Sequence, residues 1–203
     1  MLVSRSRDKL INAILFFAER TRALGKIKLF KLLYLLDFEH FRKTGRPVTG
    51  MEYRAWKMGP VPAQLVQEWD ELESDLAEAI EIRPERVIDY VRENVIAKRA
   101  FDAAHFTPRE IEIMDGLARI YADVLSDRMI DVTHAENGAW ATVWCDGRGN
   151  DQPVDYRLAL TENNPNRDAI LEANRDAILE ASRDREAMTR AAMVRAENIQ
   201  PTA

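Results

Sequence analysis

The segment from Lys28 to Pro62 joins a strongly apolar helical pattern to a stretch rich in glycine and proline, and it constrains the fold more than any other part of the chain. Its first part is apolar on almost every side of a helix, which is typical of a helix buried inside a domain. The apolar positions are Ile27, Leu29, Phe30, Leu32, Leu33, Leu35, Leu36, Phe38 and Phe41. The polar stripe that remains consists of Lys28, Lys31, Glu39 and Arg42. We predict a buried helix over residues 27–44 whose polar stripe faces solvent.

A short β element should follow this helix. Gly45 predicts the helix end, because glycine readily adopts the left-handed conformation found after many helices. Pro47 then favours an extended chain, and residues 51–56 alternate between apolar and polar as in a half-buried strand. The sequence Gly59–Pro62 predicts a turn, with Pro62 at the first position of another helix.

The flanking segments also predict helices. Ser6 is a candidate N-cap for a first helix that ends near Gly25. Residues 65–76 have the apolar spacing of an amphipathic helix, and the outer face of that helix is strongly acidic. Residues 80–104 fit short strands or short helices, and the pattern does not decide between them.

Thr107, Pro108 and Glu110 have the order of a capping box with proline at the first helical position, which predicts a helix from residue 108 onward. Ser126 is a candidate cap for a further helix. Residues 1–160 are therefore expected to form one compact, mainly α-helical domain with a small β hairpin element.

The C-terminal segment contains an exact repeat, because NRDAILEA occurs at residues 166–173 and again at 174–181. Eight residues advance a helix by two turns and about 80°, so the two copies do not build one apolar stripe. We predict that residues 161–203 form a charged, solvated helical extension. The alternative is an arm that binds a partner.

Two motifs in this sequence resemble the Panacea domain, the SocA-like antitoxin family of bacterial and phage toxin–antitoxin systems. The first combines the KL.KLLY helix, the TGRPVTG..Y.AW hairpin and the GPV turn of residues 28–62, and the second is LSDRMIDVTHAENGAW at residues 125–140. The resemblance covers about the first three-quarters of the chain. It implies an antitoxin that binds a toxin protein encoded next to it. In SocA-like proteins it also implies an adaptor that delivers the toxin to a protease.

The resemblance also implies roles for individual motif residues. We predict a toxin-binding surface that consists of Lys28, Lys31, Trp56, Lys57, Gly59 and Pro60. The other motif residues are expected to be structural, and they are Tyr34, Gly45, Pro47, Gly50, Tyr53, Val61, Pro62, His134 and Trp140.

The composition argues against a metal, a cofactor or a catalytic centre. Cys145 is the single cysteine, and the three histidines are dispersed along the chain, so no set of residues has zinc-site spacing. His134 lies near Glu136, as a general base near an orienting carboxylate would. No nucleophile or phosphate-binding loop accompanies this pair, so we expect His134 to be hydrogen-bonded near a helix end and packed by Trp140, and we expect no enzyme.

The first 57 residues carry 13 Lys or Arg against 5 Asp or Glu, although the whole chain has a net charge of −5. This basic end motivates the alternative function, a nucleic-acid-binding transcriptional regulator. The basic residues are scattered, and no helix-turn-helix or aromatic RNA platform is recognisable, so nucleic acid is not the partner we expect. No apolar run approaches the length of a membrane span, and no signal peptide precedes the first helix, which predicts a cytoplasmic protein without a membrane partner.

Overall fold

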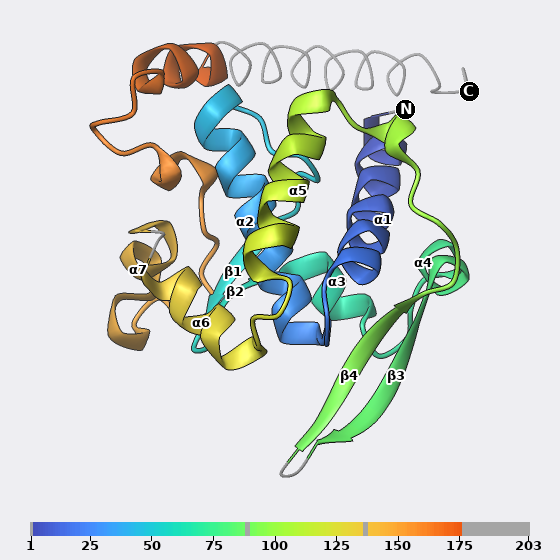
Figure 1. Cartoon of the computed structure of the whole chain (residues 1–203). Coiled ribbons are helices and arrows are strands. Elements are labelled where there is room, and N and C mark those ends of the chain that lie inside the picture. Colours follow the sequence, from blue (N-terminus) through green and yellow to red (C-terminus); the bar gives the residue numbers. More distant parts are fainter. Residues whose placement is uncertain (1, 88–89, 136–137, 176–203) are drawn as a thin grey trace, which may run out of the picture. The chain divides into compact units, whose positions relative to one another are not determined.

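The computed structural model describes residues 2–87, 90–135 and 138–175. The chain divides into two compact units, with the boundary between Thr161 and Glu162. The first unit is mainly α-helical and carries two small antiparallel sheets (Figure 1), which confirms the predicted fold class. In the second unit, residues 167–175 are helical. Most of the second NRDAILEA copy lies outside the described residues.

The described residues of the first unit form α-helices, β-strands and short 3-10 helices. The α-helices are α1 (Leu2–Arg20), α2 (Lys26–Thr44), α3 (Ala63–Glu68), α4 (Ser74–Ala79), α5 (Pro108–Tyr121), α6 (Ser126–Ala135) and α7 (Gly138–Trp144). The strands are β1 (Tyr53–Trp56), β2 (Gly59–Pro62), β3 (Ile80–Val87) and β4 (Tyr90–Ala97). Short 3-10 helices occur at η1 (Ala103–His105), η2 (Cys145–Gly147) and η3 (Tyr156–Ala159).

Helix α2 lies at the centre of the first unit, where α1, α5, α6 and β2 pack around it (Figure 1). Its leucines Leu29, Leu32, Leu33 and Leu36 are fully buried. Burial of one such side chain stabilises the fold by roughly 1.5–3 kcal/mol, so this helix contributes much of the core. The prediction of a buried helix over residues 27–44 is therefore confirmed, and Gly45 ends it in the left-handed conformation with φ of 75°.

The predicted solvent-facing stripe on α2 is wrong for its two lysines. Lys28 is 0% exposed and Lys31 is 1% exposed. Both aliphatic stems are long enough to carry the ammonium groups to backbone carbonyl oxygens, and those hydrogen bonds make the burial possible. The stripe reaches solvent only toward the C-terminal end of the helix, where Arg42 is exposed and Glu39 is half-buried.

Strands β1 and β2 form an antiparallel hairpin in which Tyr53 pairs with Pro62 and Trp56 pairs with Gly59. This hairpin confirms the predicted β element near residues 51–56. The Gly59–Pro62 segment, predicted as a turn, is itself the second strand. Pro62 precedes α3 rather than occupying its first position, because the helix begins at Ala63.

The acidic helix predicted over residues 65–76 is interrupted, since α3 ends at Glu68 and α4 begins at Ser74. The break places Trp69 in the core, where its ring contacts Phe30 edge-on with centroids 5.1 Å apart. Part of the predicted acidic outer face is also paired. The Arg7 guanidinium donates two hydrogen bonds to the Glu68 carboxylate, at 2.6 and 2.7 Å.

The undecided segment, residues 80–104, contains the β3–β4 hairpin, which extends away from the helices (Figure 1). Ile80 and Val95 anchor its base in the core, and the Val95 N–H donates to the Leu24 carbonyl at 2.8 Å. The alternation of buried and exposed residues is weak along both strands. This weak alternation explains why the sequence pattern alone did not decide the structure.

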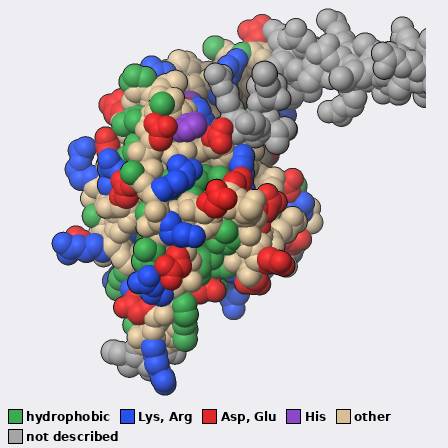
Figure 2. Space-filling model, turned by 90° about the vertical axis from the view of Figure 1, so that its right-hand side faces the viewer, with side chains coloured by type: hydrophobic (Ala, Val, Ile, Leu, Met, Phe, Trp, Pro, Cys, Tyr) green, Lys and Arg blue, Asp and Glu red, His purple; other side chains and the backbone are tan. Residues whose placement is uncertain are grey.

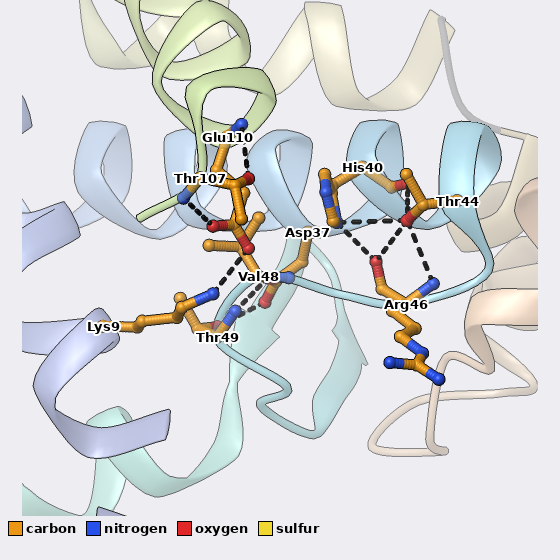
Figure 3. A network of polar contacts seen from close by, with 9 residues as sticks. All are labelled: Lys9, Asp37, His40, Thr44, Arg46, Val48, Thr49, Thr107 and Glu110. Carbon is orange, nitrogen blue, oxygen red and sulfur yellow. Dashed lines mark hydrogen bonds and ion pairs between the residues drawn. The ribbon is translucent and has the colours of Figure 1, made fainter. Parts of the chain in front are cut away.

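The capping box at the start of α5 is confirmed, because Thr107 accepts from the Glu110 N–H and Glu110 accepts from the Thr107 N–H. Lys9 adds an ion pair to Glu110 at 2.6 Å and so ties α1 to α5 (Figure 3). Two predicted caps are wrong, since Ser6 lies within α1 and Ser126 is the first residue of α6.

In the described part of the chain, no helix combines the length and the apolar character that crossing a membrane requires.

Candidate functional site

The two sequence motifs meet where α2 and α6 pack against strand β2. The Lys31 ammonium of α2 donates a hydrogen bond to the Pro60 carbonyl at 2.9 Å. Gly59 lies directly over this contact with φ of 97°, and a β-carbon there would be 2.7 Å from Lys31 Nζ and 3.0 Å from Thr133 Oγ1. Glycine suits this position, because a side chain would be strained at this φ and would require Lys31 Nζ to shift.

A second group of motif residues holds the other end of the hairpin turn. The Trp140 indole N–H of α7 donates to the Trp56 carbonyl at 3.1 Å. The His134 ring stacks on the Trp140 ring with centroids 3.8 Å apart and an interplanar angle of 2°. The expected packing of His134 by Trp140 is thus confirmed. Together with Lys31, these residues surround the turn between β1 and β2 from inside the domain.

The polar groups behind the turn are incompletely paired. Burial lowers the pKa of Lys31 to about 7, and no acidic side chain offsets this effect. Burial also lowers the pKa of His134, and the positive charge of Lys31 lowers it further. Behind the turn, the described atom His134 Nε2 is buried without a hydrogen-bond partner, so the hydrogen bond expected for this histidine is not found at that nitrogen. Burial raises the pKa of Tyr34, so its hydroxyl stays protonated at neutral pH.

Lys28 lies one helical turn before Lys31 on α2 but serves a different contact. Its ammonium donates to the carbonyl oxygens of Arg22 and Ala122, both at 2.9 Å. These carbonyls follow the C-terminal ends of α1 and α5, where a lysine hydrogen-bonds favourably with the last carbonyl groups. Burial lowers the pKa of Lys28 to about 8. Lys28 and Lys31 were both predicted to lie on the toxin-binding surface with the turn, but only Lys31 hydrogen-bonds beside the turn.

Of the six residues predicted to bind a toxin, Trp56 and Lys57 are exposed in the structure, whereas the two lysines of α2 and the Gly59–Pro60 pair are buried. Trp56 is 41% exposed, and its indole N–H donates to Asp151 Oδ1 at 3.0 Å. Met58 is 54% exposed and completes the turn. Met58 was not among the predicted residues, although it lies between Lys57 and Gly59.

A buried carboxylate fixes the loop that leads into the hairpin. Asp37 of α2 accepts hydrogen bonds from the backbone N–H groups of Val48 and Thr49, at 2.8 and 2.7 Å (Figure 3). It also accepts from the Thr49 hydroxyl at 2.5 Å and from the Tyr53 hydroxyl at 2.9 Å. The Tyr156 hydroxyl lies 3.3 Å from the same carboxylate. Burial raises the pKa of Asp37, while these hydrogen bonds oppose that shift.

Asp37 was missed as a site residue, although a single aspartate within an apolar helix is a signal that sequence reasoning could use. A buried acid needs several donors, and the loop after the helix supplies them. Gly45 and Gly50 shape this loop with φ of 75° and 71°, which fits their predicted structural role. Tyr53 and Val61 of the hairpin are buried.

Within residues 2–87, 90–135 and 138–175, no three His, Cys, Asp or Glu side chains are placed so that they could hold a metal ion. Cys145 is exposed. His134 stacks on the Trp140 indole ring, and the positive charge of Lys31 acts on it electrostatically.

Comparison with known families identifies the domain. A family model described as antitoxin SocA-like, Panacea domain, matches residues 29–141. No curated protein and no solved structure gave a significant match. The matched region covers more than half of the chain and includes most of α2, the β1–β2 hairpin, α6 and Trp140. The chain therefore belongs to the SocA-like Panacea-domain antitoxin family.

Proposed function

We propose that this protein neutralises a toxin protein by direct contact through the contact turn, which we define as Trp56, Lys57, Met58 and Gly59. The observation that carries the proposal is the combination of an exposed apolar tip and a buried motif scaffold. Trp56 and Met58 expose their side chains, while Lys31 and Trp140 hold the backbone beneath them. The family membership makes a toxin the partner that we propose.

The chemistry of the contact turn suits a protein interface. Tryptophan is among the residues that most often dominate binding energy, and methionine adapts its shape to a partner surface. Lys57 adds one exposed positive charge to these two apolar side chains. A turn held from inside loses little conformational freedom on binding, so more of its contact energy contributes to affinity. The partner surface should therefore offer an apolar pocket with an acidic rim.

The test is a rescue assay with the toxin encoded beside this gene. Cells that express the toxin should survive with the wild-type chain, and a double variant, Lys57→Glu with Met58→Asp, should lose rescue and bind the toxin at least tenfold more weakly. The matched control is Arg99→Glu with Ile120→Asp, which introduces the same two acidic residues at one exposed basic and one exposed apolar position outside the contact turn. Full rescue by the first variant would refute this surface.

Two finer points belong to the same proposal. A chain that stops after Glu162 should retain neutralisation, because it keeps the whole family match and all the residues around the contact turn. Loss of rescue by this truncated chain, while it stays folded, would assign binding to the C-terminal arm.

Delivery to a protease is tested separately, by following the half-life of the toxin with and without this protein in cells that lack individual proteases.

A role in nucleic-acid binding finds little support in the surface. On the face that carries the β3–β4 hairpin, Figure 2 shows basic and acidic side chains interspersed rather than a continuous basic patch. Nucleic-acid binding depends mainly on phosphate contacts and weakens steeply with salt. Operator-specific DNA binding by the isolated chain at physiological salt would replace the proposed function with that of a regulator.

A further inference from the structure

We propose that Lys31 and Trp140 are positioning residues that clamp the contact turn by the carbonyl groups on its two sides, so that the turn meets its partner in one preformed conformation. This inference rests on the proposed function, because it assigns the buried motif residues to presentation of the same surface. Neither residue would touch the toxin.

The geometry of the clamps comes from two separate elements. Lys31 extends from α2 and donates to the carbonyl of Pro60, which directly follows the contact turn. Trp140 extends from α7 and donates to the carbonyl of Trp56, the first residue of the contact turn. The β1–β2 ladder pairs Trp56 with Gly59, so the exposed residues Lys57 and Met58 lie between two fixed points.

The surroundings make both donors difficult to replace. Lys31 is 1% exposed and Trp140 is 5% exposed, so water cannot readily take over either hydrogen bond. His134 stacks on Trp140 and limits the orientations of the indole ring. Gly59 leaves room for the ammonium group, since a β-carbon at that position would overlap Lys31 Nζ. Lys31, Trp140, His134 and Gly59 therefore form one connected set of contacts under the turn.

A preformed turn improves binding in a measurable way. A protein whose binding-competent conformation is only partly populated has an apparent affinity reduced by that fraction. Loss of one clamp should release the contact turn without releasing the core, because the clamps hold carbonyl groups at its two ends and the core leucines of α2 stay packed. The expected signature is faster local opening of the turn together with weaker toxin binding.

The experiment compares Lys31→Met and Trp140→Phe with the wild-type chain. Each variant keeps an apolar side chain in place and removes the donor. Amide hydrogen exchange on the isolated protein should accelerate about tenfold at residues 57–59 and stay unchanged in α5, and toxin affinity should fall by about tenfold. The matched controls are Lys28→Met, which removes a buried donor to the Arg22 and Ala122 carbonyls, and Trp69→Phe, which removes a donor to Glu93. The controls should leave exchange at residues 57–59 unchanged.

Three results would overturn the proposal. Unchanged exchange at residues 57–59 in both variants would show that the two hydrogen bonds do not hold the turn. Equal acceleration in the turn and in α5 would indicate a general loss of stability instead of local positioning. Faster turn exchange with unchanged toxin affinity would separate the clamps from binding. The contact surface itself is judged independently by the Lys57→Glu, Met58→Asp variant, so failure of the clamps and failure of the proposed function are distinguishable.

Discussion

The Lys31→Met substitution should change how the stability of the fold depends on pH. In the folded protein burial lowers the pKa of Lys31 from 10.5 to about 7, so the unfolded chain binds this proton more tightly. Between these two values the unfolded state carries more protons than the folded state, and the unfolding free energy therefore rises with pH. Methionine cannot titrate, so the variant lacks this contribution.

The magnitude follows from the two pKa values. Between pH 7 and pH 9, the proton linkage of Lys31 should add about 2 kcal/mol to the wild-type unfolding free energy, at 1.36 kcal/mol per pKa unit. Above pH 10.5 the Lys31 amine is unprotonated in both the folded and the unfolded state, so the gain in unfolding free energy is complete. Below pH 7 the amine is protonated in both states, so no gain remains. The variant should also be at least as stable as wild type at pH 7, because removal of a desolvated ammonium outweighs loss of one hydrogen bond, which contributes about 1 kcal/mol.

Urea unfolding at pH 7, 8 and 9, followed by tryptophan fluorescence, measures both effects in the wild-type chain and the variant. The control is Lys43→Met, which makes the same substitution at a lysine that is 47% exposed. Lys28 titrates in a similar window but is present in every protein compared, so its contribution cancels. Parallel stability curves for wild type and Lys31→Met would refute the assigned burial of this amine.

Two further changes test the loop and the turn. Asp37→Asn should lower the unfolding free energy by about 3 kcal/mol in urea titrations, because the amide places a donor among buried donors; unfolding at wild-type urea concentrations would contradict this. Gly59→Ala should lower it by about 1–3 kcal/mol, since φ is 97° and the β-carbon would be only 2.7 Å from Lys31 Nζ. The matched Gly116→Ala variant, in a helix with open space around the site, should gain about 0.5–1 kcal/mol, and equal effects of the two changes would refute the explanation.

The sequence predicted those parts of the fold that depend on local chemistry. The capping box at Thr107 and the left-handed end at Gly45 were both confirmed, because each is determined by residues within one turn of the helix end. The break between α3 and α4 was missed because the spacing of Leu65, Trp69 and Leu76 suits a continuous helix. The core requires Trp69 against Phe30, and this tertiary contact outweighs helical periodicity.

The site was predicted in part. The motifs selected Trp56, Gly59, His134 and Trp140, but nothing in the sequence shows that Thr133 approaches Gly59 across more than 70 residues of chain. The hydrogen bonds from Lys31 and Trp140 to backbone carbonyls are equally invisible, because any residue type supplies a carbonyl group. Sequence patterns report side-chain chemistry, whereas these contacts depend on the path of the backbone.

The two lysines of α2 show how this limitation alters a functional assignment. A lysine beside an apolar face is usually solvated, and charged side chains are rarely buried without a partner. Here the partners are carbonyl oxygens of Arg22, Ala122 and Pro60, which lie outside the helix. A binding surface drawn through buried lysines would place the toxin on the core. Because both ammonium groups point into the protein, the contact turn is the part of this motif that we propose for toxin binding. Charge reversal at Lys28 or Lys31 would therefore test folding instead of recognition.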